Sequence, residues 1–230
     1  MCIRDRSSLT GPLATLQVPS DTGGANWPGG AFDPETNRLY VHSHTATFTI
    51  AIIAADPTVS DMGYVSGLAR ADGPAVPATS MSSRARAATA QGLPLVKPPY
   101  DRITSFDMNS GDLIWQKTHS STPDEIANHP ALKGLNLPRL GQPGRTFIGV
   151  LATKTLLIAG EGGVHTNEKG ERVALLRAYD KVTGADVGAV NMPATQTGSP
   201  MTYMVNGRQF IVVAVSDVNG ASLIAYALPE

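Results

Sequence analysis

Asn26 and Trp27 place a hydrogen-bonding amide beside a flat apolar ring. The pair lies between two glycine-rich stretches, Gly23-Gly24 and Gly29-Gly30. An amide donates and accepts hydrogen bonds, and an indole offers an apolar face to a planar ring. Glycine also permits close backbone approach. The pair can therefore contact a planar ligand, and the alternative is a tryptophan that fills an interface between sheets.

Histidines offer a second kind of chemistry. His42 and His44 lie two residues apart in a predicted strand, so both side chains are expected on one face. That spacing suits a metal ion such as Zn²⁺. A third ligand is not evident, because His119, His129 and His165 are scattered along the sequence. We therefore predict no metal site, and a histidine that lines a substrate cleft is the alternative.

Three aspartates that could be mistaken for a general base belong to a repeated turn. Asp33, Asp107 and Asp180 occupy the same position of a repeated turn motif, so we predict a structural role for them. The charged residues around Pro98-Pro99 precede a predicted strand, and we expect them to be solvated: Lys97, Asp101 and Arg102. No catalytic residue is assigned in this chain.

Composition narrows the class of protein. The 230 residues carry a net charge of -1, so no cationic surplus points to nucleic acid. The 23 glycines and 17 prolines separate short apolar runs, as in antiparallel sheets. Cys2 is the single cysteine and excludes an intramolecular disulfide, and no apolar run reaches the roughly 20 residues that span a bilayer. We interpret residues 1–8 (MCIRDRSS) as a non-native leader, which leaves the location of the protein open.

The elements that position these residues are predominantly strands, and the fold class is all-β. The predicted strands are rich in Val, Ile, Leu, Thr and aromatic residues: Arg38 to His42, Thr47 to Ile53, Ile103 to Phe106, Leu113 to Trp115, Thr155 to Ala159, Ala174 to Tyr179, Phe210 to Val215 and Ser222 to Ala227. The best helix runs from Asp124 to Ala131, after a Thr122 cap and Pro123 at the first helical position. Residues 69–91 are predicted to be a loop insertion, with weak helical character over 82–91.

A turn motif occurs three times, starting at Ala31, Ser105 and Ala178. A small residue, an Asp, a Thr or Ser, and a Gly or Asn occupy offsets zero, two, five and six. Asp can accept bonds from the N–H groups of the turn, and Gly or Asn suits a positive-φ bulge position. The near-equal intervals predict a repeat architecture, namely β-propeller blades with insertions.

The residue at offset ten lies on the second strand of the hairpin. In the clearest copy it is Trp115, which can cover a neighbouring sheet. Together these features resemble the docking motif Ala-x-Asp-x-x-Thr-Gly-x-x-x-Trp of the pyrroloquinoline quinone (PQQ) dependent dehydrogenases. The copy at Ala178 departs from that motif, because Gly188 replaces the Trp.

The resemblance runs from about Pro19 to Glu230. It includes Gly23 to Trp27, Leu93 to Tyr100, Gly198 to Met204 and Asn206 to Val213, and the ending Leu223 to Pro229 resembles the glucose dehydrogenase-like branch. It implies that residues 9–230 are the C-terminal blades of an eight-bladed propeller. It further implies that Asn26, Trp27 and Phe147 contact PQQ; Phe147 resembles the aromatic residue of a loop that reaches the central face.

The resemblance also implies a function. Family members oxidise an alcohol or aldose sugar, with PQQ held by a calcium ion and a carboxylate base that removes the hydroxyl proton. Electrons pass to a quinone pool or a cytochrome, and the location is the periplasm or the periplasmic face of the inner membrane, with possible membrane association through the N-terminal part.

The family's calcium ligands and base have no counterpart in this sequence. We therefore expect roughly half of a propeller that is inactive alone. The alternatives are a non-catalytic quinoprotein-like scaffold in envelope protein assembly and an unrelated all-β binding domain.

Overall fold

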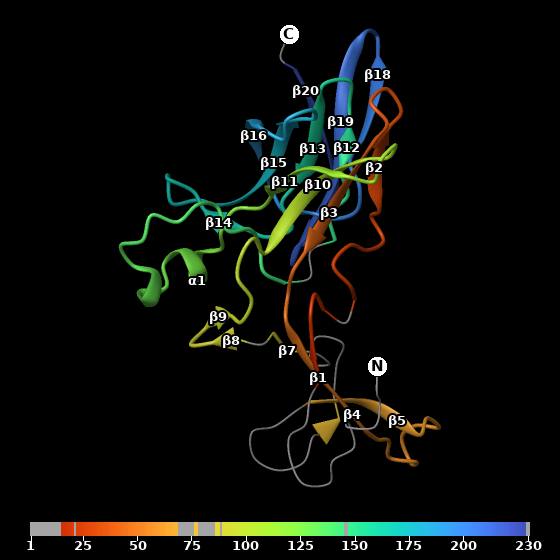
Figure 1. Ribbon diagram of the computed structural model, residues 1–230, viewed down its shortest axis with the longest axis vertical. Coiled ribbons are helices and arrows are strands. Elements are labelled where there is room, and N and C mark those ends of the chain that lie inside the picture. Colours follow the sequence, from red (N-terminus) through yellow and green to blue (C-terminus); the bar gives the residue numbers. More distant parts are fainter. Residues whose placement is uncertain are drawn as a thin grey trace. The chain divides into compact units, whose positions relative to one another are not determined.

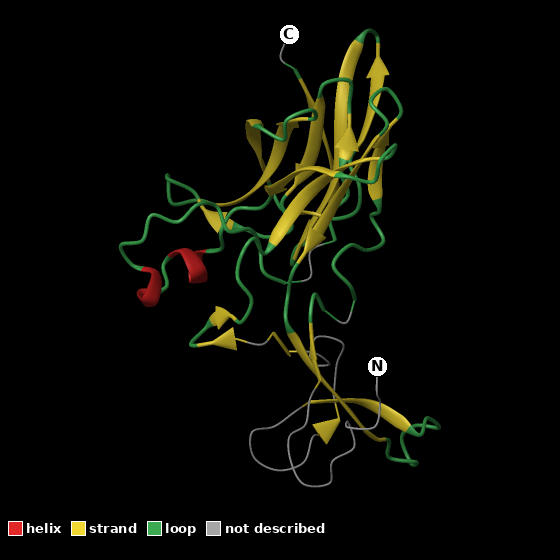
Figure 2. Ribbon diagram, in the orientation of Figure 1, coloured by secondary structure: helices red, strands yellow, loops and turns green. Residues whose placement is uncertain are grey.

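The structure is a computed structural model that describes residues 15–20, 22–68, 76–77, 86–87, 89–144 and 147–228. Strands dominate this part of the chain, and helix is confined to one short region of it (Figure 2). The all-β prediction is therefore confirmed. The predicted leader at 1–8 lies outside the described residues.

The chain divides into two compact units. Unit 1 comprises Met1–Gly24 and Thr45–Lys97, and unit 2 comprises Ala25–His44 and Pro98–Glu230. The main sheet of unit 1 has the order β1-β4-β5-β6, with β7 also pairing with β4. Its strands are β1 (Thr15–Gln17), β4 (Phe48–Ala54), β5 (Tyr64–Leu68), β6 (Val76–Pro77) and β7 (Arg86–Ala87), beside a separate pair, β8 (Thr89–Ala90) and β9 (Leu93–Pro94).

Unit 2 contains three antiparallel sheets (Figure 1). The first has the order β11-β10-β3-β2, the second β12-β13-β15-β16 with β14 also on β15, and in the third β19 pairs with β17, β18 and β20. The strands of the first sheet are β2 (Gly30–Asp33), β3 (Arg38–His44), β10 (Asp101–Asp107) and β11 (Leu113–Thr118). Those of the second are β12 (Leu151–Ala152), β13 (Leu156–Gly160), β14 (His165–Thr166), β15 (Arg172–Asp180) and β16 (Asp186–Met192). Those of the third are β17 (Thr195–Gln196), β18 (Met201–Val205), β19 (Arg208–Asp217) and β20 (Gly220–Ala227).

All eight predicted strands are present, most of them longer than predicted. The predicted helix is shorter: α1 spans Asp124–Ala127 and is followed by the 3-10 turn η3, Pro130–Leu132. The Thr122 cap is wrong, because the Thr122 hydroxyl accepts a bond from Leu140 N instead. The predicted insertion at 69–91 lies largely outside the described residues. Its described parts include β6, β7 and β8, so the helical interpretation is wrong at 86–87 and 89–90.

The three copies of the turn motif are not equivalent. The copies at Ser105 and Ala178 form the β10–β11 and β15–β16 turns of successive sheets, whereas the copy at Ala31 forms the β2–β3 turn. The copies at Ala31 and Ser105 therefore lie on the same sheet. Met108 N donates to Asn37 O over 2.9 Å, which places these two turns side by side. The prediction that all three mark successive blades is wrong, because two hairpins at one end of a four-stranded sheet share the same turn chemistry.

The predicted turn chemistry is confirmed. Asp180 Oδ1 accepts bonds from the N–H of Val182 and Thr183 and from the Thr183 hydroxyl, at 2.8–3.0 Å. Gly184 follows with a φ of 72°, a region that glycine occupies without strain. The carboxylates of the other two copies make similar bonds. The three aspartates are thus structural, as predicted.

Trp115 joins the first sheet to the second. Its indole lies against Gly184, where a Cβ atom would stand 2.8 Å from two ring carbons, and its Nε1 donates to Lys181 O over 3.3 Å. The Tyr40 hydroxyl donates to the same carbonyl over 3.1 Å. The predicted role of the residue at offset ten, cover for a neighbouring sheet, is therefore confirmed for Trp115.

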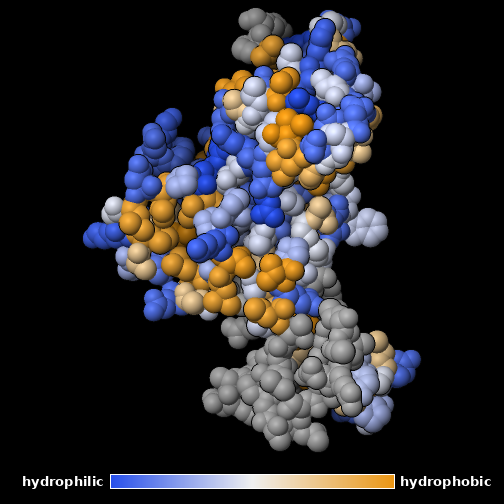
Figure 3. Space-filling view, viewed as in Figure 1, coloured by the Kyte–Doolittle hydropathy of each residue, from blue (hydrophilic) through white to orange (hydrophobic). Residues whose placement is uncertain are grey.

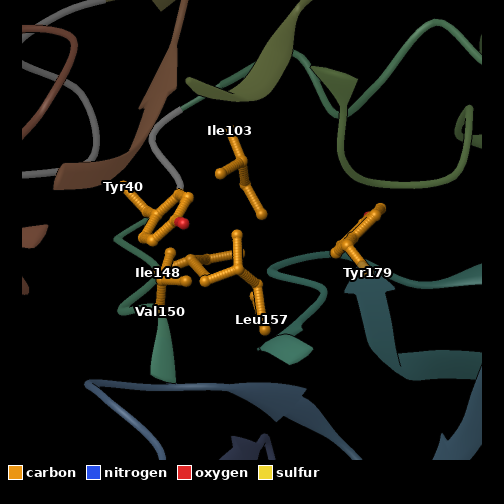
Figure 4. Packing of buried hydrophobic residues seen from close by; sticks show 7 residues of the cluster. Tyr40, Ile103, Ile148, Val150, Leu157 and Tyr179 are labelled. Atoms are coloured by element: carbon orange, nitrogen blue, oxygen red, sulfur yellow. The ribbon is translucent and has the colours of Figure 1, made fainter. Parts of the chain in front are cut away.

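Two buried clusters fill the spaces between the sheets. The first includes Tyr40, Ile103, Ile148, Leu157 and Tyr179 and joins the first two sheets (Figure 4). The second joins the second and third sheets and consists of Ile158, Ala174, Leu176, Met192, Ala194, Val213 and Val215. Alternate residues of the central strands supply most of both clusters, as expected for sheets packed face to face.

Candidate functional site

The structure brings the chain segments of the predicted site residues together. Asn26 and Trp27 lead into β2, and Phe147 leads into the segment before β12. Both segments meet the chain between β17 and β18: Ser199 Oγ donates to Pro28 O over 3.3 Å, and Gly149 N donates to Gly198 O over 3.0 Å. We call residues 26–28, 147–149 and 198–199 the strand-start cluster.

The aromatic residues of the strand-start cluster are open to solvent. The Trp27 side chain is 96% exposed and Phe147 is 39% exposed. Asn26 Oδ1 accepts a bond from Trp27 N over 2.7 Å, which fixes the amide against the backbone of its neighbour. Trp27 therefore fills no interface between the described sheets. Its indole is available to cover a ligand.

Gln196 holds two parts of the strand-start cluster. It is 4% exposed, and its amide nitrogen donates to Gly149 O over 2.9 Å and to Gly198 O over 2.8 Å. Its Oε1 accepts from Gly160 N over 2.5 Å. A Cβ atom at Gly149 would lie within 2.5 Å of three Ser199 atoms. This position therefore requires glycine, because the two segments run in direct contact.

His44 lies behind Phe147. It is fully buried, and its ring meets the Phe147 ring edge-on with centroids 6.1 Å apart. His42 is also buried. Both histidines belong to the packed interior of the first sheet. They share a face with Tyr40, as their spacing predicts.

Asp101 is the centre of a buried polar network. Its Oδ1 accepts from Ser120 N over 3.0 Å and from Gln142 N over 3.1 Å, and its Oδ2 accepts from the Ser120 hydroxyl. His42 Nε2 lies 3.5 Å from Oδ2. Burial alone would raise the pKa of Asp101, but the nearby His42 and His119 imidazoles and the hydrogen bond from Ser120 outweigh it and lower the pKa to about 2. The expectation that Asp101 is solvated is wrong, because its side chain lies on the buried face of β10.

His119 connects the first sheet to the second. Its Nδ1 lies 2.8 Å from Tyr179 Oη and its Nε2 lies 3.0 Å from Gly160 O. Because a carbonyl only accepts, Nε2 carries the proton and Nδ1 accepts from the tyrosine hydroxyl. Burial is the main cause that lowers the pKa of His119, to about 4. The imidazole is therefore neutral near pH 7.

Glu161 completes this link from the second sheet. It is 1% exposed, and its Oε1 accepts from Ser121 N, Ser121 Oγ and Arg177 Nε at 2.7–2.8 Å. Its Oε2 accepts from Leu175 N over 3.1 Å. Consecutive residues 119–121, which we call the polar seam, are thus bonded to both sheets through buried groups.

Sequence reasoning missed Asp101, His119, Glu161 and Gln196. The alternation of side chains along a strand could have indicated the burial of Asp101. Asp101 lies two and four residues before the buried Ile103 and Ser105, so its side chain points to the same face of β10. The other three lie outside the regular part of a strand or at its end, where sequence alone does not show their partners.

Among the residues that the structure describes, no group of three or more His, Cys, Asp or Glu side chains is arranged to hold a metal ion. Within the same residues, no helix is long and apolar enough to cross a membrane.

Comparison with known proteins gives consistent matches. Residues 8–211 match the family model of the β-propeller domain of PQQ-dependent glucose, ethanol and alcohol dehydrogenases. The chain is 26% identical to a probable quinate dehydrogenase (quinone) of Xanthomonas campestris pv. juglandis over 96% of its own length and 28% of the relative. It is 29% identical to the quinate/shikimate dehydrogenase (quinone) of Acinetobacter baylyi, again over 96% of its length and 27% of the relative. The chain therefore spans little more than a quarter of these relatives.

A solved structure agrees with the fold. Quinohemoprotein alcohol dehydrogenase from Comamonas testosteroni superposes with a TM-score of 0.54 at 20% identity, over 92% of this chain and 25% of that one. The three sheets of unit 2 are thus part of a quinoprotein propeller. On its docking turns, its strand-start cluster and these matches, the chain belongs to the PQQ-dependent dehydrogenase β-propeller family.

Proposed function

We propose that the whole protein containing this chain is a PQQ-dependent dehydrogenase that oxidises the hydroxyl group of an alcohol, sugar or related polyol. PQQ supplies the chemistry, since the bound quinone accepts hydride from the substrate carbon. Similar proteins are named for quinate, glucose, glycerol and alcohols, which share an oxidisable C–OH group. The observation that carries the proposal is the exposed Trp27 indole in the strand-start cluster.

The residues of that cluster fit a planar, polar-edged cofactor. Trp27 presents a flat apolar face that can cover a ring. Asn26 adds an amide that can bond to a carbonyl or carboxylate at the ring edge. Phe147 borders the same segments and is supported from behind by His44. In this role the chain binds and orients the cofactor and removes water from one of its faces.

We assign the catalytic base and the calcium ligands to the rest of the protein. The aspartates of the repeated turns accept hydrogen bonds within their own turns. Asp101 and Glu161 are buried and accept hydrogen bonds from several donors. We therefore assign the role of base to none of them. On this reasoning the chain alone binds no calcium and has no dehydrogenase activity.

The proposed membership of the PQQ-dependent dehydrogenases also suggests a cell compartment and an electron acceptor. We propose that it works in the periplasm or at the periplasmic face of the inner membrane. Electrons then leave the reduced cofactor to a quinone pool or a cytochrome.

Reconstitution tests the proposal. The whole apoprotein is titrated with PQQ in excess Ca²⁺, and dye reduction is followed with quinate, glucose, glycerol and ethanol. Trp27→Ala should raise the PQQ concentration for half-maximal activity by roughly ten-fold, which corresponds to about 1.4 kcal/mol. Tyr64→Ala, at an exposed tyrosine of unit 1, is the matched control and should leave it unchanged. Absence of both PQQ binding and dye reduction would instead favour a non-catalytic scaffold.

A further inference from the structure

Gln196, at the end of β17, is a buried amide whose partners are backbone groups. Many polar side chains of unit 2 lie at its surface (Figure 3), but Gln196 is only 4% exposed. Its side chain is bonded to Gly149 O, Gly198 O and Gly160 N. A buried backbone group that loses such a partner carries the cost of its own desolvation. The position of the surrounding chain therefore depends on this amide.

Gln196 acts on the segment of Phe147 through Gly149. Its amide nitrogen donates to Gly149 O over 2.9 Å, and Gly149 follows Phe147 by two residues. Gly149 N donates in turn to Gly198 O over 3.0 Å, and Ile148 pairs with Gly198 in an isolated parallel bridge. The backbone directly after Phe147 is thus held through both its N–H and its carbonyl groups. Gln196 therefore helps to set where this aromatic side chain lies.

The same amide acts on the segment of Trp27 through Gly198. Gly198 O accepts from Gln196 Nε2 over 2.8 Å and lies one residue before Ser199. The Ser199 hydroxyl donates to Pro28 O over 3.3 Å, and Pro28 follows Trp27. One buried amide therefore stands between the two segments that supply the proposed aromatic contacts of the cofactor.

The third bond anchors the amide to the second sheet. Gln196 Oε1 accepts from Gly160 N over 2.5 Å, at the end of β13. Gln196 N also donates to Glu161 O over 2.9 Å, and Gly160 O accepts from His119 Nε2 over 3.0 Å. A Cβ atom at Gly160 would stand 2.7 Å from Oε1 and 2.9 Å from the Cβ of Gln196. The amide is therefore fixed on a buried and tightly packed support.

The three partners require an amide. Two carbonyl oxygens meet one end of the side chain and an N–H group meets the other, and an amide supplies both donors and an acceptor. A carboxylate of the same shape offers acceptors alone, so one of its oxygens would face the two carbonyl oxygens. A methionine of similar length offers no donor.

We propose that Gln196 is a positioning residue of the cofactor site, which raises the affinity for PQQ by aligning the segments of Trp27 and Phe147. This inference rests on the proposed function, because it takes PQQ as the ligand. Gln196 acts through those segments, since it is itself buried. The affinity should therefore depend on the hydrogen bonds of the amide and not on the volume that its side chain fills.

Gln196→Glu tests these bonds at constant shape. PQQ binding to the whole apoprotein in excess Ca²⁺ is measured by equilibrium dialysis from about pH 8 to about pH 5.5, always relative to wild type. Near pH 8 the dissociation constant should be at least about ten-fold higher in the variant. Burial and the two carbonyl oxygens raise the pKa of the new carboxyl group, and its protonated form can donate to one of them. The difference should therefore shrink as the pH falls.

Gln116→Glu is the matched control. Gln116 is an exposed glutamine of the first sheet, so its variant should bind PQQ as wild type does at each pH. Equal affinities of Gln196→Glu and wild type across the pH range would overturn the proposal.

Gln196→Met separates the hydrogen bonds from charge. It adds no carboxylate that could repel the anionic cofactor, and it should still weaken PQQ binding by about ten-fold, with no dependence of this loss on pH. A loss of affinity in Gln196→Glu alone would indicate repulsion of PQQ by the new charge and would contradict the proposal.

Gly160→Ala gives a second route if the Gln196 variants do not fold. Its methyl group displaces the amide of Gln196 without changing it, so PQQ affinity should fall as well. The Tm without PQQ is recorded for each variant, and a lower Tm with unchanged affinity would leave Gln196 a purely structural role. If wild type binds no PQQ, the proposed function fails. If wild type binds PQQ and the variants bind it equally well, only this inference fails.

Discussion

The Nζ atom of Lys181 lies 2.7 Å from Asp33 Oδ2, and both side chains are buried. Lys181 belongs to the turn of the second sheet and Asp33 to a turn of the first, so the ion pair joins the sheets beside Trp115. The same carboxylate also accepts a hydrogen bond from the Thr36 hydroxyl within its own turn. The pairing lowers the pKa of Asp33 against the opposing effect of burial and raises that of Lys181.

Removal of one partner should be more harmful than removal of both. Lys181→Met leaves the Asp33 carboxylate buried without its cation and should lower the free energy of unfolding by about 3 kcal/mol. Asp33→Asn combined with Lys181→Met should recover part of that loss. Urea unfolding of the four proteins of the double-mutant cycle measures the coupling. Additive losses would mean that the pair contributes no coupling free energy.

The contact between Trp115 and Gly184 can be separated from backbone strain. Gly184→Ala places a methyl group 2.8 Å from the indole and a non-glycine residue at a φ of 72°. Gly111→Ala, at a φ of 81° with open space around it, has only the second problem and should cost about 1 kcal/mol. Gly184→Ala should cost clearly more in urea unfolding. Equal costs would contradict close packing of the indole on this turn.

Acidification should weaken the polar seam in a defined pH window. The folded pKa of His119 is about 4 and the usual value is 6.5, so the unfolded state binds the proton first. Each pH unit between about 6.5 and 4 should therefore remove about 1.4 kcal/mol of stability. Asp101, with a folded pKa of about 2, adds a further loss as pH falls from about 3.8 to 2.

His119→Gln should reduce the slope of the free energy of unfolding against pH between about pH 6.5 and 4. The control is Tyr179→Phe, which removes the hydroxyl bonded to Nδ1 but keeps the imidazole buried; it should lower stability and retain the slope. Urea unfolding at intervals from pH 7 to 4.5 gives both slopes. An unchanged slope in His119→Gln would assign the acid sensitivity to other groups.

The close contact between Gly149 and Ser199 in the strand-start cluster predicts that a substitution at one position can be compensated at the other. Gly149→Ala brings a methyl group against Ser199 and should separate the two segments, which raises the PQQ concentration needed for half-maximal reactivation. Ser199→Gly removes two of the three nearest atoms and should restore part of the affinity in the double variant. Equilibrium PQQ titration of the whole protein measures the effect. The absence of any rescue would argue against this contact as the cause.

Local rules predicted the strands and turns of this protein well. Asp107, Asp180 and their glycines follow turn chemistry that acts within a few residues, and Trp115 covers the next sheet as its place in the motif indicates. Asp33 shows the limit: its motif is the same, but only the structure shows that its turn lies on the sheet of Asp107. The spacing of turns does not reveal which strands pair.

The buried polar network was less predictable for the same reason. Asp101 follows two prolines and resembles a surface residue in sequence, yet its donors come from Ser120 and Gln142 and its neighbour His42 from another strand. Such partners are set by long-range packing. Asn26, Trp27 and Phe147 could be singled out because the family resemblance includes their segments, and their contact with PQQ stays a prediction.

The pairing of β3 with β10 encloses a long excursion of the chain. His44 is opposite Asp101 in the register, so the whole of Thr45–Lys97 is a closed loop inserted into the middle of one sheet. The entropy of closing such a loop grows only logarithmically, and doubling its length costs only about 0.6 kcal/mol more. Extra residues in the turns between the strands of this excursion should therefore add little closure cost, while β2 and β3 keep their register.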